Sequence, residues 1–336
     1  METMTLREIA AALGCHPDAC ADAVITNITI DSREAGEGTL FFAIKGDRFD
    51  AHDFVSDVIA KGAAAAVCSR PVEGVPEEKL LLVADTRLAF LALAAYYRAK
   101  FDIPVVGLTG SVGKTTTKEM VAAVLSRKYN TLATQGNLNN EIGLPKMCFR
   151  LDRSVEAAVL EMGMSGFGEI SRLTRTARPT VGIITNIGVC HIEMLGSREG
   201  ILRAKMEILE GMDKTAPLII NGDNDLLPEG VKGIPNPVIV CGIDCENADC
   251  RAEEIVQESI VMIIIKNTAN YEMKFTAEDV VERFFCGDKS RNTEGSGLGL
   301  SIAQGFTIAC GGTFNLEVDG DQFKVILTFQ ICSKRT

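Results

Sequence analysis

Short apolar runs alternate with polar turns over the first 85 residues. Four of these runs have the length and apolar character of β-strands: 24–30, 39–45, 64–68 and 80–85. Thr5 and Glu8 form a capping-box pattern, which predicts a helix that continues to Leu13, and another helix is predicted near 52–63. The pattern therefore predicts a small α/β module over residues 1–85, and a helical stretch at 86–100 leads out of it.

From residue 103 the chain alternates between apolar strands and helices. The predicted strands are 103–109, 157–163, 181–187, 216–221 and 237–243. Helical patterns follow at 114–129 and 197–212. This alternation predicts a mainly parallel sheet with helices on both faces over residues 86–257, and ligands of such sheets bind beyond the carboxyl ends of the strands.

The pattern changes near residue 258. The remaining stretch, 258–336, predicts one strand, two helices and a closing hairpin, at 260–267, 276–285, 299–310, and 313–318 with 323–331. Antiparallel strands accompanied by helices predict a partial α+β layer.

The composition of the chain limits the kinds of molecule that it could bind. The chain of 336 residues has 34 basic and 45 acidic side chains, a net charge of −11, which argues against nucleic-acid binding. The longest apolar stretches, 88–97 and 260–265, are too short to span a bilayer, and the first residues lack a signal-peptide pattern. We therefore expect a cytoplasmic protein without membrane insertion. A monomer is a separate expectation.

The eleven cysteines are scattered along the chain, a pattern typical of a protein whose thiols stay reduced. Cys241, Cys245 and Cys250 cluster, but the chain has no CxxC pair. We interpret this cluster as a loop and strand-end group rather than as a zinc site.

A glycine-containing loop follows the strand at 103–109 and begins the helix at 114. Its residues have the types that hold nucleotide phosphates and Mg²⁺: Gly110, Ser111, Val112, Gly113, Lys114, Thr115 and Thr116. Leu108 stands where the strict motif has its first glycine. The alternative is an ordinary strand–helix turn that contains glycine.

Several motifs resemble those of the Mur ligases of peptidoglycan synthesis. Beside the phosphate loop, they lie at 28–54, 136–145, 160–170, 185–209 and 220–225. Over residues 1–257 the chain looks most like the members that add D-Ala-D-Ala to UDP-MurNAc-tripeptide, apart from Ala51, where the family usually has glycine. The resemblance implies a ligase that uses ATP and Mg²⁺ and activates a carboxylate as an acyl phosphate.

The resemblance also implies roles for individual residues. Lys114, His191 and Lys205 would be catalytic, with Lys205 carbamylated, and Asn221 would contact adenine. The implied metal ligands are Thr115, Glu161, His191 and Lys205. The implied substrate-binding residues are Asp31, Ser32, Arg33, Asn137 and Asn140.

Ordinary structural roles are the alternatives for these residues. Glu161 could be an exposed acid at a strand end, and Lys205 a solvated helix lysine. His191 could be structural, and residues 31–33 a surface turn.

The stretch "SRNTEGSGLGLSIAQG" at 290–305 resembles the ATP lid of sensor histidine kinases, with Gly295, Gly297 and Gly299 matching its glycine box. The resemblance covers about 260–331. A complete kinase ATPase domain also needs a second glycine motif, and no glycine occurs from 261 to 285. We therefore expect little ATP binding there and interpret the chain as a fusion of two fragments.

The leading expectation is thus an ATP-dependent ligase, with activity impaired because the third Mur domain is missing. A kinase-like signalling module is the first alternative, and a non-catalytic protein that binds UDP-linked precursors is the second.

Overall fold

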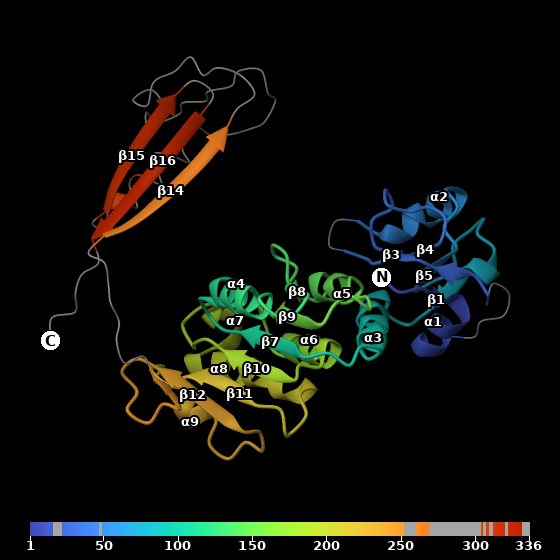
Figure 1. The fold of residues 1–336 in the computed structure, drawn as a ribbon. Helices are drawn as coiled ribbons and strands as arrows, with labels where there is room; N and C mark the ends of the chain where they lie inside the picture. The colour runs from blue at the N-terminus through green and yellow to red at the C-terminus, as the bar shows by residue number, and fades with distance from the viewer. Residues whose placement is uncertain are drawn as a thin grey trace. The chain divides into compact units, whose positions relative to one another are not determined.

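The computed structural model describes residues 1–15, 22–46, 49–251, 260–268, 304, 307–308, 312–319 and 322–330 (Figure 1). The chain divides into two compact units, Met1–Ala252 and Glu253–Thr336. The first unit contains an N-terminal module and a central domain, each built on a parallel sheet. The predicted α/β class, with a large parallel sheet flanked by helices, is confirmed.

The N-terminal module has a four-stranded parallel sheet in the order β3-β4-β5-β6. These strands are β3 (Asn27–Thr29), β4 (Thr39–Phe42), β5 (Ala65–Cys68) and β6 (Leu80–Leu82). The helices of the module are α1 (Leu6–Leu13), η1 (Ala51–Phe54), α2 (Val55–Ala60) and η2 (Glu77–Lys79). The predicted cap of α1 is confirmed, because the Thr5 hydroxyl accepts a hydrogen bond from the Glu8 amide at 3.2 Å.

The strand predicted at 24–30 is divided between two sheets. β2 (Val24–Ile25) pairs antiparallel with β1 (Met4–Thr5), whereas β3 pairs parallel with β4. Thr26 separates them, and its amide donates to the Gly38 carbonyl at 2.9 Å. The single-strand prediction was wrong because the two halves have different partners, and an apolar pattern does not specify pairing.

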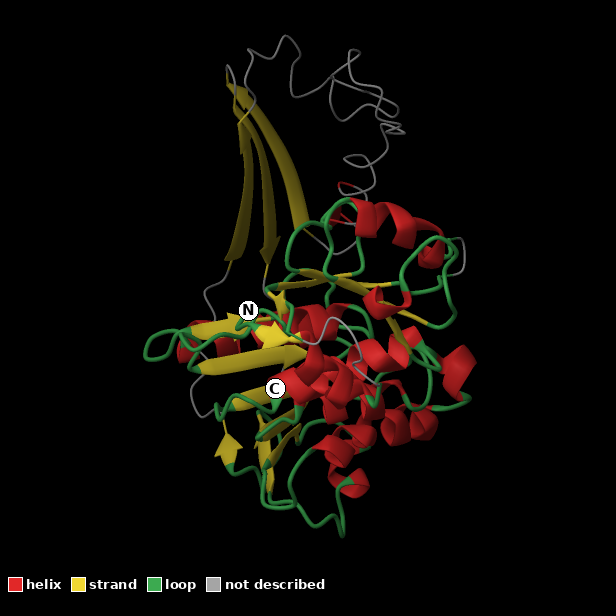
Figure 2. Cartoon of the chain, turned by 90° about the vertical axis from the view of Figure 1, so that its right-hand side faces the viewer, coloured by secondary structure: helices red, strands yellow, loops and turns green. Residues whose placement is uncertain are grey.

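The central domain has a seven-stranded sheet in the order β13-β12-β11-β10-β7-β9-β8, in which every neighbouring pair is parallel. The strands are β7 (Val105–Thr109), β8 (Thr131–Ala133), β9 (Ala157–Glu161), β10 (Val181–Ile184), β11 (Leu218–Asn221), β12 (Val238–Gly242) and β13 (Cys250–Arg251). The helices are α4 (Lys114–Leu125), α5 (Gly143–Cys148), α6 (Glu169–Ala177), α7 (Ile192–Leu195), α8 (Arg198–Met206), η3 (Glu207–Gly211) and α9 (Leu227–Gly230). Figure 2 shows the strands running side by side next to several of these helices.

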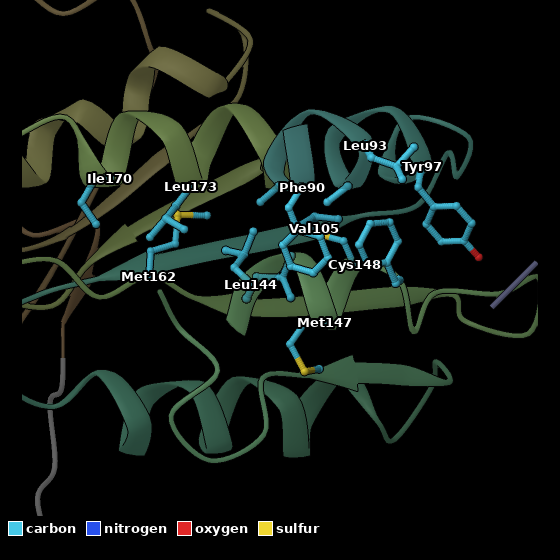
Figure 3. Packing of buried hydrophobic residues seen from close by; sticks show 14 of the residues in the cluster. Phe90, Leu93, Tyr97, Val105, Leu144, Met147, Cys148, Met162, Ile170 and Leu173 are labelled. Atoms are coloured by element: carbon cyan, nitrogen blue, oxygen red, sulfur yellow. The ribbon is translucent and has the colours of Figure 1, made fainter. Parts of the chain in front are cut away.

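The two faces of the central sheet bury different side chains, since neighbouring residues of a strand point to opposite faces. On one face, Leu108 and Val159 pack with Ala122 of α4. On the other, Val105 and Leu160 join the main core with residues of α5 and α6. Figure 3 shows part of this main core, including Val105, Leu144, Ile170 and Leu173. Both faces are therefore covered, and the strand ends are left to carry polar groups.

Helix α3 (Thr86–Arg98) joins the N-terminal module to the central domain. Its Phe90 ring lies 5.0 Å from the Phe42 ring and 5.5 Å from the Phe149 ring, between centroids. The buried Tyr97 hydroxyl donates to the Leu151 carbonyl at 2.6 Å, so this polar atom keeps a partner in the core.

The second unit contains a three-stranded antiparallel sheet in the order β14-β16-β15. Its strands are β14 (Ile260–Thr268), β15 (Gly312–Asp319) and β16 (Gln322–Gln330). The predicted hairpin is confirmed by the pairing of β15 with β16. The helix expected at 276–285 lies outside the described residues, as does the glycine-rich stretch 290–305 apart from Gln304.

Candidate nucleotide and metal site

The candidate phosphate loop lies between β7 and α4, at the carboxyl end of the central sheet. Gly113 has φ +79° at the start of α4, a conformation that L side chains rarely adopt. A Cβ atom on Gly110 would lie 1.8 Å from the Thr185 hydroxyl oxygen. Glycine is therefore required at Gly110 for close approach and is strongly favoured at Gly113.

The segment after β10 contacts this loop closely. The side-chain oxygen of Asn186 accepts hydrogen bonds from the amides of Ser111 (3.1 Å) and Val112 (2.9 Å). The Lys114 ammonium donates to the Gly110 carbonyl at 2.8 Å, so this lysine lies along its own loop. Sequence reasoning missed Asn186, although it belongs to the quoted motif at 185–209.

Glu161, at the end of β9, is the centre of a buried polar group. It is 2% exposed, which excludes the exposed-acid alternative. Its carboxylate accepts hydrogen bonds from the Thr115 hydroxyl (3.1 Å) and the Asn139 side-chain amide (2.8 Å). Its own amide donates to the Thr134 hydroxyl at 2.9 Å.

The surroundings of Glu161 fit a hard cation. The two side chains that donate to it are neutral, and a buried carboxylate is stabilised when a cation balances its charge. Carboxylate and hydroxyl oxygens are also the ligands that Mg²⁺ prefers. The predicted pair of Thr115 and Glu161 is thus brought together.

His191 lies in a different setting. It is exposed, has φ +64°, and immediately precedes α7. Within the described ranges, no hydrogen bond joins it to Glu161 or Thr115, and no three His, Cys, Asp or Glu residues form a group that could hold a metal. Its role as a metal ligand stays a prediction.

Lys205, on α8, is 3% exposed, which excludes the solvated-lysine alternative. Its pKa is lowered to about 7, mainly by burial and also by the nearby Lys114 ammonium, while Cys190 acts in the opposite direction. A lysine with such a pKa is partly neutral at pH 7, and only the neutral amine is nucleophilic.

Asn221 lies at the carboxyl end of β11, in the same sheet as the phosphate loop. Its side-chain oxygen accepts from the Asp223 amide at 3.0 Å. Asp223 in turn accepts from three successive amides after β12, those of Ile243, Asp244 and Cys245. The loop after β11 is therefore well ordered by its own side chains.

The asparagines of the loop at 136–145 lie in different surroundings. Asn140 accepts from the amides of Ile142 (3.1 Å) and Gly143 (2.8 Å) at the start of α5, and Asn137 is exposed. Asn139, which sequence reasoning passed over, is the member that contacts Glu161. The substrate roles predicted for Asn137 and Asn140 remain predictions.

Asp31, Ser32 and Arg33 line a cavity of about 850 Å³ in the first unit. Asp31 pairs with Arg33 at 2.5 Å, and the hydrogen bond from Arg33 holds the pKa of Asp31 well below its usual range. Two further cations line the same cavity, Arg87 of α3 and Lys146 of α5. The other lining residues are mainly apolar: Ile30, Phe41, Ile44, Gly46, Phe49, Ala51, Phe54 and Ile142.

The cysteine cluster lies at the edge of the central sheet. Cys241 of β12 and Cys250 of β13 are register partners in a parallel pair. All three cysteines of the cluster are free thiols.

Among the helices that the structure describes, none has the length and apolarity needed to cross a bilayer.

A parallel sheet with a glycine-rich loop, a lysine and a buried acid at its carboxyl end defines a nucleotide-binding protein of the phosphate-loop class. The family models are more specific: "Mur ligase middle domain" matches residues 108–282, more than half of the chain, and "Mur ligase family, catalytic domain" matches 24–97. The chain belongs to the Mur ligase family, whose members are ATP-dependent ligases. The first match continues past residue 257, where the sequence pattern placed a boundary.

Curated relatives carry the name UDP-N-acetylmuramoyl-tripeptide–D-alanyl-D-alanine ligase. The chain is 46% identical to the Synechocystis protein over 209 residues, which cover 62% of this chain and 46% of that one. It is 46% identical to the Bacillus subtilis protein over 205 residues, 61% of this chain and 45% of that one. The chain thus spans about half the length of the curated relatives it matches.

Solved structures agree with the fold. MurF from Acinetobacter baumannii has a TM-score of 0.71 at 39% identity, covering 76% of this chain and 56% of that one. MurF from Thermotoga maritima, solved in complex with ADP, has a TM-score of 0.60 at 32% identity, covering 74% and 54%.

Proposed function

We propose that this chain carries the substrate-binding and ATP-binding parts of a ligase that joins D-Ala-D-Ala to UDP-MurNAc-tripeptide. The observation that carries the proposal is the contact of Thr115 in the phosphate loop with the buried Glu161. The names of the relatives supply the substrate pair.

The reaction joins a carboxylate to an amine, and a carboxylate is a poor acyl donor. An oxygen of the tripeptide carboxylate attacks the γ-phosphorus of ATP, ADP leaves, and an acyl phosphate results. The dipeptide amine then attacks the acyl carbon, loses a proton, and inorganic phosphate leaves. Two anions must therefore approach one another, so the site must supply positive charge.

The chain's own residues suit this requirement. Lys114 would move from the Gly110 carbonyl to the β- and γ-phosphates, and the free amides at the start of α4 would face the same phosphates. Thr115 and Glu161 would hold Mg²⁺, with His191 and a carbamylated Lys205 as further ligands. When bound, Mg²⁺ supplies charge that stabilises the transferring phosphoryl group.

Asn221 would contact adenine, because it lies at the carboxyl end of β11 in the sheet that carries the phosphate loop. The uridine nucleotide would occupy the cavity of about 850 Å³, where aromatic rings suit a base and Arg33, Arg87 and Lys146 suit a diphosphate. Asn137 and Asn140 would lie by the substrate. We retain the expectation that the protein is cytoplasmic. We also retain the expectation that it is a monomer, and size-exclusion chromatography of the purified chain would test its oligomeric state.

The test is a titration of the purified chain with ATP and with UDP-MurNAc-tripeptide, followed by an assay of ADP release with and without D-Ala-D-Ala. We expect both ligands to bind, and Lys114→Ala to abolish ATP binding while the UDP-linked ligand still binds. UDP-ligand binding without any ATP binding would instead support the non-catalytic alternative.

The signalling alternative is not favoured. It depends on 290–305, which lies outside the described residues apart from Gln304. The family match and the relatives all favour the ligase. Unchanged ATP affinity in Lys114→Ala would revive it.

A further inference from the structure

The segment Thr185–Gly188, directly after β10, contacts the phosphate loop through several hydrogen bonds. Besides the two bonds to the Asn186 side chain, the Asn186 carbonyl also accepts from the Ser111 amide at 3.1 Å. The Thr185 hydroxyl donates to the Val112 carbonyl at 2.7 Å, and the Gly188 amide donates to the Ser111 hydroxyl at 2.9 Å. The loop is therefore fixed mainly from this one segment.

The same segment is also held by the loop that follows β11. The Ile187 carbonyl accepts from the Asn224 side-chain amide of this loop (3.3 Å) and from Arg198, the first residue of α8 (2.9 Å). Arg198 forms a two-pronged ion pair with Asp225, at 2.7 and 2.5 Å. The Ile187 side chain is 1% exposed, so the segment has little freedom to move independently.

Asn186 holds the loop without blocking its phosphate-facing amides. It accepts from Ser111 and Val112, whereas the amides at the start of α4 come from the residues that follow, Gly113 to Thr115. A loop already in its bound shape loses less entropy when a phosphate binds.

We propose that Asn186 is a positioning residue that couples the loop after β11 to the phosphate loop. Contacts made by the base side of a nucleotide would then favour the phosphate-binding shape of residues 110–113, through Ile187 and Asn186. The inference rests on the proposed ATP binding, and on Asn221 being on the adenine side.

The test is calorimetric binding of ADP and of adenosine to the full chain, combined with thermal unfolding. We expect Asn186→Ala to weaken ADP binding about 30-fold, the fold-change that two hydrogen bonds of ordinary net strength correspond to. Adenosine, which has no phosphate, should bind within about twofold of the wild type.

The matched control is Asn236→Ala. Asn236 is buried, 6% exposed, and it too braces a loop, through the carbonyls of Asp213 (2.8 Å) and Ala216 (2.9 Å), at the amino end of the same sheet. It should lower the melting temperature without weakening ADP binding. Equal weakening of ADP binding by both variants would mean that Asn186 is merely structural and would overturn the proposal.

A second variant covers the case in which Asn186→Ala does not fold. Arg198→Ala removes the ion pair with Asp225 and one bond to Ile187 at a partly exposed site, and we expect it to weaken ADP binding about threefold. Unchanged ADP binding in Arg198→Ala would overturn the coupling. If the wild-type chain binds no nucleotide, both the proposed function and the coupling are overturned. If the wild type binds ADP and Asn186→Ala binds it equally well, only the coupling is overturned.

Discussion

The two candidate binding regions of the first unit hold their charged groups in different ways. At the carboxyl end of the central sheet, Glu161 and Lys205 are buried, and Glu161 has fixed hydrogen-bond partners. In the cavity lined by residues of the N-terminal module, α3 and the start of α5, the Arg33 side chain is 87% exposed and pairs with the nearby Asp31.

This difference has consequences for both stability and binding. A buried charge perturbs folding and pKa values, so a change at the central sheet should affect stability and ligand affinity together. An exposed charge is screened by water, so a change in the cavity should affect ligand affinity with little effect on stability.

The largest effect is expected at Glu161. Glu161→Gln removes the negative charge but keeps the shape, so we expect Mg²⁺-dependent nucleotide binding to weaken by at least about 100-fold, because even outer-shell partners of a metal are worth 10–100-fold. Calorimetry with ATP, with and without Mg²⁺, measures the change.

The matched control is Glu156→Gln, at the amino end of the same strand, where the carboxylate accepts from the Asn130 amide at 2.8 Å. It should leave nucleotide binding unchanged. A Glu161→Gln variant that keeps the full Mg²⁺ dependence would remove Glu161 from the metal site.

The next effect concerns Gly110. A Cβ atom there would collide with the Thr185 hydroxyl at 1.8 Å, and overpacking of this kind costs about 1–3 kcal/mol. Gly110→Ala should therefore lower the free energy of unfolding in urea by that amount and weaken ATP binding. Gly36→Ala is the control, because its Cβ would meet no atom within 4 Å.

If Gly110→Ala and Gly36→Ala prove equally stable, the close packing of the phosphate loop against the segment after β10 is wrong.

Part of this region was predictable from the sequence. The strand at 103–109 and the helix beginning at Lys114 follow from local patterns, and the strand at 157–163 places Glu161 at the same sheet edge. The pairing with Thr115 was implied by the family resemblance, and in the structure β9 lies parallel to β7, which brings their carboxyl ends together.

Other contacts could not be predicted because they join residues far apart in the chain. Asn186 bonds to Val112, 74 residues away, and Asn139 bonds to Glu161, 22 residues away. Three asparagines lie within four residues at 137–140, and only the path of the loop decides which of them faces Glu161. Arg87 and Lys146 reach the cavity from α3 and α5, whose packing a single sequence does not specify.

A smaller effect is expected from the ionisation of Lys205. Its pKa is about 7 in the folded chain and near 10.5 when unfolded. Between these values the unfolded chain binds a proton that the folded chain does not, so the free energy of unfolding should rise with pH, by up to about 1.4 kcal/mol per pH unit. Below pH 7 the full penalty of a buried ammonium remains.

Urea unfolding of the wild type and Lys205→Met at pH 6, 7.5 and 9, in bicarbonate-free buffer, measures this contribution. Lys205→Met should be the more stable variant at pH 6, and its advantage should shrink by pH 9. Parallel pH profiles would show that Lys205 has an ordinary pKa.

The smallest effect on stability is expected in the cavity that Asp31, Ser32 and Arg33 line. Arg87 is exposed and Lys146 is half-buried, so Arg87→Ala and Lys146→Ala should each change the free energy of unfolding by less than about 0.5 kcal/mol. Each should nevertheless weaken UDP binding, by about three- to tenfold, because each removes one cation from a site for a diphosphate.

Calorimetry with UDP at two salt concentrations measures this change, since the contribution of exposed cations falls as ionic strength rises. Arg127→Ala, an exposed arginine after α4, is the control and should leave UDP binding unchanged. A large loss of stability in Arg87→Ala or Lys146→Ala would contradict the difference drawn between the two regions. Folding would then depend on the cations of the cavity, as it does on the buried groups of the central sheet. UDP binding that stays the same in both variants would place the uridine nucleotide elsewhere.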